Sequence, residues 1–148
     1  MNVIAVTRKL SVMGQPHVAD FASLARHGFA TVISNRPDGE APDQPGSQAE
    51  ELAAKQAGLA YVHIPVTSTG ITNDDARRFQ QAIEASPGPV VAHCRSGARS
   101  FFLWIMTGDL ENKRDDEVLA LAEKLHLDPK AVAARLAARR LRPAGENI

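Results

Sequence analysis

The sequence predicts an α/β fold in which a mostly parallel central sheet is flanked by helices in three layers. Short apolar runs rich in β-branched residues alternate with segments whose apolar residues recur at helical spacing, and this alternation is typical of a parallel sheet covered by helices. The chain is 44% hydrophobic and 23% charged over 148 residues, which allows one domain to bury its own core. We therefore expect a single domain over residues 1–148.

Four segments have the composition of strands. Each is short and mainly apolar, and each is bounded by glycine, proline or polar residues that favour turns. The expected strands are residues 9–13, 30–34, 59–66 and 90–93.

Six further segments have the spacing of helices. The first stops at Gly28, and the last has Asp128 as its N-cap with Pro129 at its first position. Residues 100–110 are apolar on nearly all sides, so we expect that helix to be central and buried. The expected helices are residues 16–27, 48–56, 74–85, 100–110, 116–125 and 131–141.

A segment rich in proline and glycine, residues 37–48, separates the second strand from the second helix. Its prolines and glycines break both the strand and the helix period. We expect a loop that is long enough to act as a flap.

Composition restricts the partners that we expect. Lys plus Arg equals Asp plus Glu, 17 of each, so neither a nucleic-acid nor a membrane partner is indicated. A single cysteine cannot form an internal disulfide, which fits a reducing compartment. With no signal peptide at the N-terminus and no apolar run of membrane-spanning length, we expect a cytoplasmic protein. The oligomeric state is left open.

The segment that follows the fourth strand carries the features of a nucleophile on an anion-binding loop. The strand delivers His93 and Cys94, a turn forms through Gly97, and Arg99 and Ser100 open the buried helix. Backbone amides at such a turn and helix start are free to bind an anion, and they favour a thiolate. Arg99 adds a planar pair of donors that matches two oxygens of an oxyanion. Ser100 could donate a hydrogen bond to the sulfur, and His93 could pin the loop or help to hold the thiolate.

Other residues are expected to contact the substrate. The backbone of the loop between cysteine and arginine would surround an oxyanion, and Arg36 and Ser68 follow two other strands whose ends should meet at the same edge. The loop residues with this role are Arg95, Ser96, Gly97 and Ala98. Scattered histidines and a lone cysteine indicate no metal site, and no glycine-rich nucleotide loop is present, so we expect no cofactor.

Four stretches of the chain, in order, resemble a bacterial family of beta-lactamase hydrolase-like phosphatases. They are SVMGQP, TVISNRPDGE, QAGLAYVHIPV and HCRSGARS. The resemblance implies a fold like that of dual-specificity phosphatases and a cysteine nucleophile at Cys94. Those phosphatases place five residues between cysteine and arginine, whereas this chain places four, which is the spacing of the rhodanese sulfurtransferases.

The general acid of dual-specificity phosphatases has no counterpart at the position that the resemblance implies. That position falls near Ser68, where no acid stands. Asp74 and Asp75 come later, at the start of a helix that Thr72 or Asn73 can cap. Carboxylates in a first helical turn stabilise the helix dipole, and we favour this role over a catalytic one.

Three functions are compatible with these features. The first is a phosphatase acting on phosphomonoesters, phosphotyrosine-like ones among them, through a thiophosphate on Cys94. The second is a rhodanese-like sulfurtransferase that forms a persulfide on Cys94. The third is a module that binds an oxyanion or a small phosphorylated molecule without turnover. The extent of the resemblance favours the phosphatase.

Overall fold

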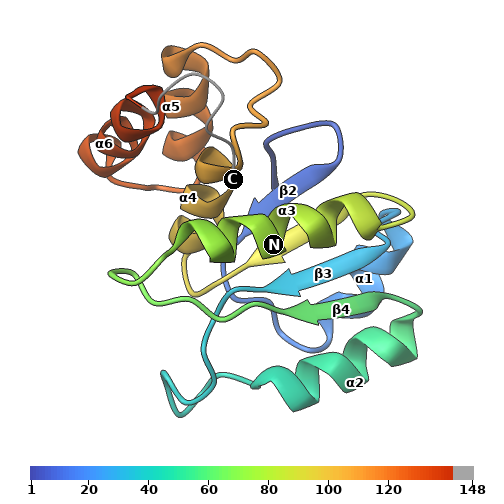
Figure 1. The fold of residues 1–148 in the computed structure, drawn as a ribbon. Coiled ribbons are helices and arrows are strands. Elements are labelled where there is room, and N and C mark those ends of the chain that lie inside the picture. The colour runs from blue at the N-terminus through green and yellow to red at the C-terminus, as the bar shows by residue number, and fades with distance from the viewer. Residues whose placement is uncertain (142–148) are drawn as a thin grey trace.

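The computed structural model describes residues 1–141, which form a five-stranded sheet flanked by helices (Figure 1). The sheet order is β1-β2-β5-β3-β4. β2, β5, β3 and β4 are parallel, and β1 is an antiparallel edge strand. The strands are β1 (Ile4–Ala5), β2 (Leu10–Met13), β3 (Thr31–Ser34), β4 (Ala60–His63) and β5 (Val90–His93).

Helices cover both faces of the sheet, which confirms the predicted three layers. α1 and α2 pack together on one face, while α3 and α4 pack on the other and α5 and α6 extend that layer (Figure 1). The helices are α1 (Asp20–Arg26), α2 (Ser47–Ala57), α3 (Asn73–Ala85), α4 (Ala98–Thr107), α5 (Asp115–Lys124) and α6 (Pro129–Arg140). Within residues 1–141, none of them is long and apolar enough to cross a membrane.

Alternating strand residues divide the core into two clusters. In β5, Val90 and Ala92 belong to the cluster under α3 and α4, whereas Val91 packs with Phe21 of α1 on the opposite face. A strand buried on both faces needs apolar residues at nearly every position, which explains why these strands read as continuous apolar runs. The α4 helix, with Trp104 nearly fully buried, lies in the core as predicted.

Some element boundaries differ from those predicted, and β1 was missed. Two residues are too few to produce a periodic signal. α1 starts at Asp20 rather than at residue 16, because the Asp20 carboxylate accepts the His17 N–H and ends a turn there. β4 stops at His63 because Pro65 has no N–H to donate, although Ile64 still donates to Ser34.

Candidate active site

The carboxyl ends of three parallel strands meet at one edge of the sheet. Ser34 at the end of β3 is in register with His63 of β4 on one side and with His93 of β5 on the other. Residues that follow these strands therefore emerge side by side, as the sequence predicted. Asn35 and Cys94 occupy neighbouring places on this edge, and the Asn35 N–H donates to the His93 carbonyl at 2.7 Å.

Cys94 lies at the bottom of a tight loop that leads into α4. The residue is 1% exposed, and the Gly97 N–H donates to its sulfur at 3.2 Å. Gly97 is the N-cap of α4 and has a φ of 98°, a conformation that residues with a Cβ rarely adopt. A Cβ there would also lie 3.4 Å from the Met13 carbonyl oxygen. Glycine at this position therefore permits both the turn and the amide contact to sulfur.

The outer wall of the loop packs against the segment between β2 and α1. The Gln15 N–H donates to the Arg95 carbonyl at 3.0 Å, and a Cβ on Gly14 would lie only 3.0 Å from the same oxygen. The side chains of Arg95 and Ser96 are exposed and line a cavity of about 480 Å³, which His17 also lines. The loop is thus buried on its inner side and open on its outer rim.

His93 is buried and ties the loop to α2. Its Nδ1 lies 3.2 Å from the Cys94 carbonyl oxygen, and its Nε2 lies 2.7 Å from Oε1 of Glu50. Both ring nitrogens thus face an oxygen, one on the loop and one on α2. The structure therefore places His93 where it can pin the loop, one of the two roles expected of it.

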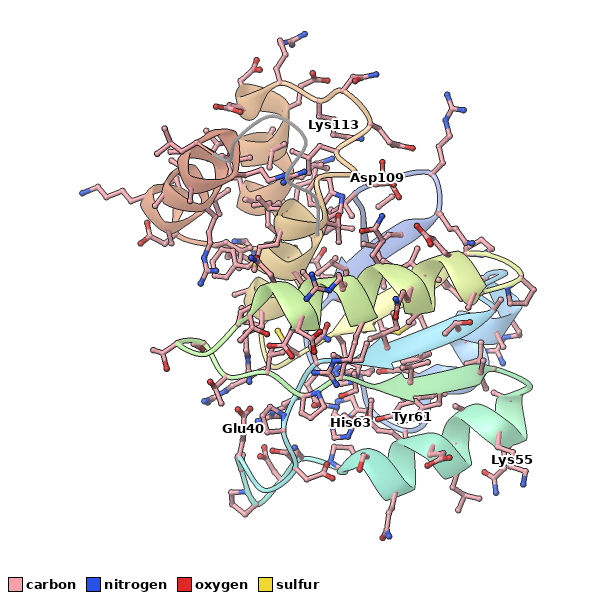
Figure 2. The ribbon with its side chains drawn as sticks, viewed as in Figure 1. Glu40, Lys55, Tyr61, His63, Asp109 and Lys113 are labelled. Carbon is pink, nitrogen blue, oxygen red and sulfur yellow. The ribbon has the colours of Figure 1, made fainter. Side chains whose placement is uncertain are left out.

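Glu50 is the acceptor at the centre of this buried cluster. Tyr61 donates its hydroxyl to Oε1 at 2.9 Å, and Gln15 donates to Oε2 at 2.8 Å. Figure 2 shows Tyr61 pointing from β4 toward α2, the helix that carries Glu50. Burial raises the pKa of Glu50, but hydrogen bonds and charge from His93, with Gln15 and Tyr61, outweigh burial and lower it. Burial and the neighbouring Glu50 raise the pKa of Tyr61.

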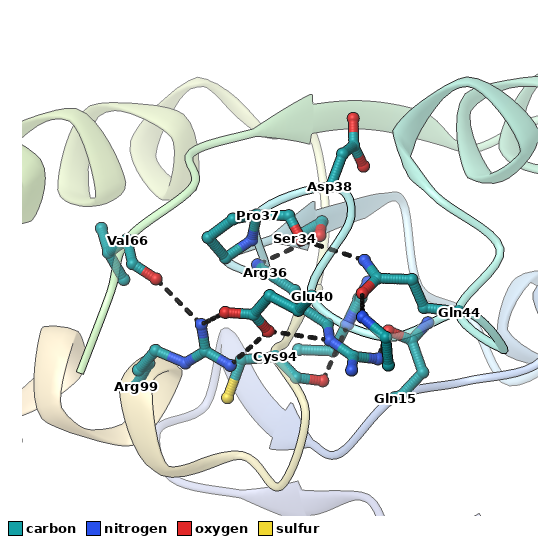
Figure 3. Close-up of polar contacts among 12 residues, drawn as sticks. Gln15, Ser34, Arg36, Pro37, Asp38, Glu40, Gln44, Val66, Cys94 and Arg99 are labelled. Atoms are coloured by element: carbon teal, nitrogen blue, oxygen red, sulfur yellow. Dashed lines mark hydrogen bonds and ion pairs between the residues drawn. The ribbon is translucent and has the colours of Figure 1, made fainter.

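Arg99 opens α4 and lies beside the Cys94 sulfur (Figure 3). Its Nη1 donates to Oε2 of Glu40 at 2.7 Å and to the Val66 carbonyl at 3.0 Å, and its Nη2 donates to Oε1 of Glu40 at 3.0 Å. The hydrogen bonds to Glu40, together with Cys94, raise the pKa of Arg99, while burial opposes this change. A thiol, a backbone amide and a guanidinium thus converge on one point, which is suited to holding an oxyanion against a nucleophile.

Ser100 differs from its expected role. Its hydroxyl donates to Oδ1 of Asn35 at 2.8 Å, while the Asn35 amide donates to the Ile64 carbonyl at 3.0 Å. A serine hydroxyl has one hydrogen, so in this structure that hydrogen is directed to Asn35 and not to the Cys94 sulfur. Ser100 ties α4 to the end of β3.

The other predicted substrate contacts fall in different surroundings. The Arg36 side chain is 5% exposed, and it donates to Glu40 and to Gln15 at 3.0 Å each. Ser68 lies exposed on the loop after β4, two residues beyond the Val66 carbonyl that contacts Arg99. Substrate binding by Arg36, by Ser68 and by the loop residues stays a prediction.

The two candidate acids lie in the first turn of α3, and one of them, Asp75, caps the helix. Asp75 and Thr72 form a capping box, in which each side chain accepts the other residue's N–H. Asp75 also pairs with Arg78, and the exposed Asp74 pairs with Arg77. Burial raises the pKa of Asp75, but the Thr72 amide and Arg78 outweigh it and lower that pKa. The position of both carboxylates in the first turn of α3 agrees with the expected stabilising role.

Two site residues, Glu40 and Glu50, were missed by the sequence analysis. Glu40 lies in the loop of residues 37–46, where no periodicity relates it to Arg99, a residue 59 positions away. Glu50 did leave a signal, because it shares the buried face of α2 with Ala54 four residues later. A carboxylate on an apolar helix face indicates a buried partner. Among residues 1–141, no three His, Cys, Asp or Glu side chains are grouped so that they could hold a metal ion.

Comparison with protein families finds one family over most of the chain. Residues 2–110 match the family described as beta-lactamase hydrolase-like protein, phosphatase-like domain. A beta-lactamase hydrolase-like protein from Xylella fastidiosa is 42% identical over 122 residues, which are 82% of this chain and 28% of that protein. One from Agrobacterium fabrum is 42% identical over 113 residues, which are 76% of this chain and 26% of that protein. The chain thus spans little more than a quarter of the length of these relatives.

Solved structures with the same fold are phosphatases by description. A candidate phosphatase from Neisseria meningitidis has a TM-score of 0.84 and 31% identity, covering 95% of this chain and 99% of its own. The core catalytic domain of the PP-IP phosphatase Siw14 from S. cerevisiae has a TM-score of 0.74 at 15% identity, covering 99% and 88%. TpbA from P. aeruginosa, solved with pTyr, has a TM-score of 0.63 at 16% identity, covering 95% and 91%. Siw14 and TpbA share with this chain one fold, the fold of the cysteine phosphatases.

Proposed function

Because this chain belongs to the family of phosphatase-like domains of beta-lactamase hydrolase-like proteins, we propose that it is a cysteine-dependent phosphatase acting on phosphomonoesters. Cys94 is the nucleophile, and the loop from Cys94 to Arg99 binds the phosphoryl group. The observation that carries this proposal is the position of the Cys94 sulfur, which accepts the Gly97 N–H at 3.2 Å and lies beside the Arg99 guanidinium (Figure 3).

The reaction has two steps. In the first, the Cys94 thiolate attacks phosphorus, an S–P bond forms, and the bond to the leaving oxygen breaks. That oxygen departs as an alkoxide or phenolate and takes its proton from solvent. In the second step, water attacks phosphorus, the S–P bond breaks and the thiolate is regenerated, while the proton of water goes to solvent or to the phosphate product. Loop amides and Arg99 would stabilise the negative charge on the phosphoryl oxygens in both steps.

The proposed substrate class follows from the donors at the site. Arg99 and the amides at the start of α4 suit a phosphoryl dianion. No acid stands at Ser68, so leaving groups that need little protonation, such as phenolates, should be favoured. The fold neighbour solved with phosphotyrosine, TpbA, is consistent with an aryl phosphate. We propose a phosphotyrosine-like or other small phosphorylated substrate.

One observation favours a second candidate, a rhodanese-like sulfurtransferase. Four residues separate Cys94 from Arg99, and this short loop would suit a persulfide on Cys94. Sulfur transfer to Cys94 also needs no general acid, so the absence of an acid at Ser68 would be explained.

One experiment separates these functions. The intact mass of the protein is recorded after incubation with 4-nitrophenyl phosphate and, separately, with thiosulfate, with Cys94→Ser as the control. A phosphoryl adduct, or release of 4-nitrophenol that requires Cys94, is the result that we expect. A single added sulfur that cyanide removes, with no release of phosphate, would establish the sulfurtransferase instead. Oxyanion binding with neither adduct nor turnover would leave only a binding module.

A further inference from the structure

The donors of Arg99 are divided between the protein and the site. A guanidinium has five N–H groups. Glu40 accepts two of them and the Val66 carbonyl accepts a third, which uses both hydrogens of Nη1 and one of Nη2. The remaining two, one on Nε and one on Nη2, share one edge of the planar group, and the Cys94 side chain is a further hydrogen-bond partner of Arg99. That edge is the one left to meet an oxyanion on Cys94.

Glu40 is itself held in place by Arg36. Nε of Arg36 donates to its Oε1 at 3.0 Å, and Nη1 of Arg36 donates to Gln15, which in turn donates to the buried Glu50. A continuous chain of hydrogen bonds therefore runs from the buried Glu50, through Glu40, to Arg99. Figure 3 shows its part from Gln15 to Arg99. Side chains linked in this way lose freedom together.

The loop that carries Glu40 is closed on itself. The Asp38 carboxylate accepts both the N–H and the hydroxyl of Ser47, at the start of α2. Gln44 donates to the Pro37 carbonyl and accepts the Ala41 N–H, at 2.9 Å each. A loop tied at both ends and across its middle can present one side chain at a defined position, as a rigid element does.

These contacts point to a role for Glu40 that deepens the proposed phosphatase function and rests on it. We propose that Glu40 is a positioning residue, which fixes the Arg99 guanidinium so that its two remaining N–H groups face the phosphoryl oxygens. The hydrogen bonds from Arg99, and secondarily those from Arg36, lower the pKa of Glu40. The carboxylate is therefore ionised, and a bidentate contact with it is available, throughout the neutral range.

Two other roles for Glu40 predict different effects of its removal on oxyanion binding. If the Glu40 carboxylate occupied the position of the substrate's phosphoryl group, its removal would strengthen oxyanion binding. If it were the missing general acid, its removal would leave oxyanion binding unchanged, and the loss of rate would grow with the pKa of the leaving group. A positioning residue should instead weaken oxyanion binding and slow all substrates by a similar factor.

The test is Glu40→Gln, with Asp43→Asn as the matched control. Asp43 is an exposed carboxylate on the same loop, so its replacement removes the same charge without touching Arg99. We expect Glu40→Gln to lower kcat by about tenfold to a hundredfold, by the same factor for 4-nitrophenyl phosphate and for phenyl phosphate. Glu40→Asp should recover part of this loss, and Asp43→Asn should lose less than about twofold.

Binding of tungstate provides a second measurement that does not depend on turnover. In the Cys94→Ser background at pH 7, Glu40→Gln should weaken tungstate binding by about tenfold, the worth of one good charge-assisted contact. In a variant that also carries Arg99→Lys, the same change should cost almost nothing, because its effect passes through the guanidinium. Tighter binding, unchanged binding, or a full additional loss in the variant that carries Arg99→Lys would each overturn the proposal.

The two arms also separate this proposal from the proposed function. If the wild-type protein releases no phosphate, the phosphatase assignment fails, yet the tungstate arm still measures whether Glu40 acts on Arg99. If phosphate is released but Glu40→Gln behaves like Asp43→Asn, the phosphatase assignment holds and the role of Glu40 is wrong. Urea unfolding of each variant confirms that any loss is not a loss of folded protein.

Discussion

Nε2 of His93 lies 2.7 Å from Oε1 of Glu50, and the two side chains are 1% and 3% exposed. A buried pair of this kind is costly to break by removing one member, because the other is left without its partner. The pair also fixes the loop, since the other nitrogen of His93 faces the Cys94 carbonyl. Stability and loop geometry therefore depend on the same contact.

Glu50→Gln should lower the free energy of unfolding by about 3 kcal/mol at neutral pH. Tyr61→Phe, which removes one neighbouring hydrogen bond and keeps the charge, should cost about 1 kcal/mol. Urea unfolding of both variants provides the comparison. Equal losses of unfolding free energy in the two variants would mean that the charge of Glu50 does not contribute to stability.

The stability difference between wild type and Glu50→Gln should also depend on pH. The pKa of Glu50 in the folded protein lies below its ordinary value of 4.5. Its contribution is therefore complete above that value and is lost as the pH falls through the lower, folded-state pKa. The free energies of unfolding of the two proteins should therefore differ most at neutral pH and approach each other as the pH falls below 4.5. A difference that does not change with pH would contradict this assignment.

Gly97→Ala should abolish most Cys94-dependent turnover. The substitution forces a residue with a Cβ into a left-handed conformation, which costs about 1–2 kcal/mol, and any relaxation moves the amide that contacts the sulfur. Gly28→Ala is the control, because Gly28 has a similar φ of 92° and a Cβ at this position would have nothing within 4 Å. Both variants should lose stability in urea, and Gly97→Ala should lose more because its Cβ meets Met13 and Leu125, but only Gly97→Ala should lose activity with 4-nitrophenyl phosphate.

Ser100→Ala should destabilise the fold by about 1–3 kcal/mol, because Oδ1 of the buried Asn35 loses its donor. Ser96→Ala removes an exposed hydroxyl that accepts the Ala98 N–H at the long distance of 3.4 Å, and it should cost only about 0.5 kcal/mol. Thermal or urea unfolding distinguishes them. A stable Ser100→Ala variant that accumulates phosphorylated Cys94 would instead restore the expected role of this hydroxyl in expelling the thiolate.

Arg95→Ala should raise KM about tenfold with little change in kcat, if the cavity that Arg95 lines receives the part of the substrate beyond the phosphoryl group. Arg26→Ala, which removes the same charge from the exposed end of α1, serves as the control. Steady-state kinetics with a phosphotyrosine peptide test this prediction. A fall in kcat alone would place Arg95 in the chemistry and not in substrate binding.

Local patterns were sufficient to predict the layers, most elements and the meeting of three strand ends. The signals behind these predictions are local ones: the apolar run of β5, a residue at 72 or 73 that can cap α3, and the glycine before α4. Such features are determined by periods and caps that a sequence displays directly.

The polar contacts between distant segments could not be predicted in the same way. Glu40 reaches Arg99 because a loop without regular structure closes through Asp38 and Ser47. Ser100 bonds to Asn35 because the Asn35 amide is already committed to the Ile64 carbonyl. Both choices depend on which donors remain after the backbone is in place, and no local spacing encodes that.

Because the Cys94 sulfur is buried, its rate of chemical labelling reports on local opening of the protein around it. Cys94 is the single cysteine of the sequence and is 1% exposed, so thiol labelling has no background from other sites. A small alkylating reagent needs only a narrow entrance, whereas a bulky maleimide needs the surrounding loops to part. The ratio of the two labelling rates therefore measures how often the loops around Cys94 move apart, and the change of this ratio with a bound oxyanion would measure how strongly the ligand holds those loops in place.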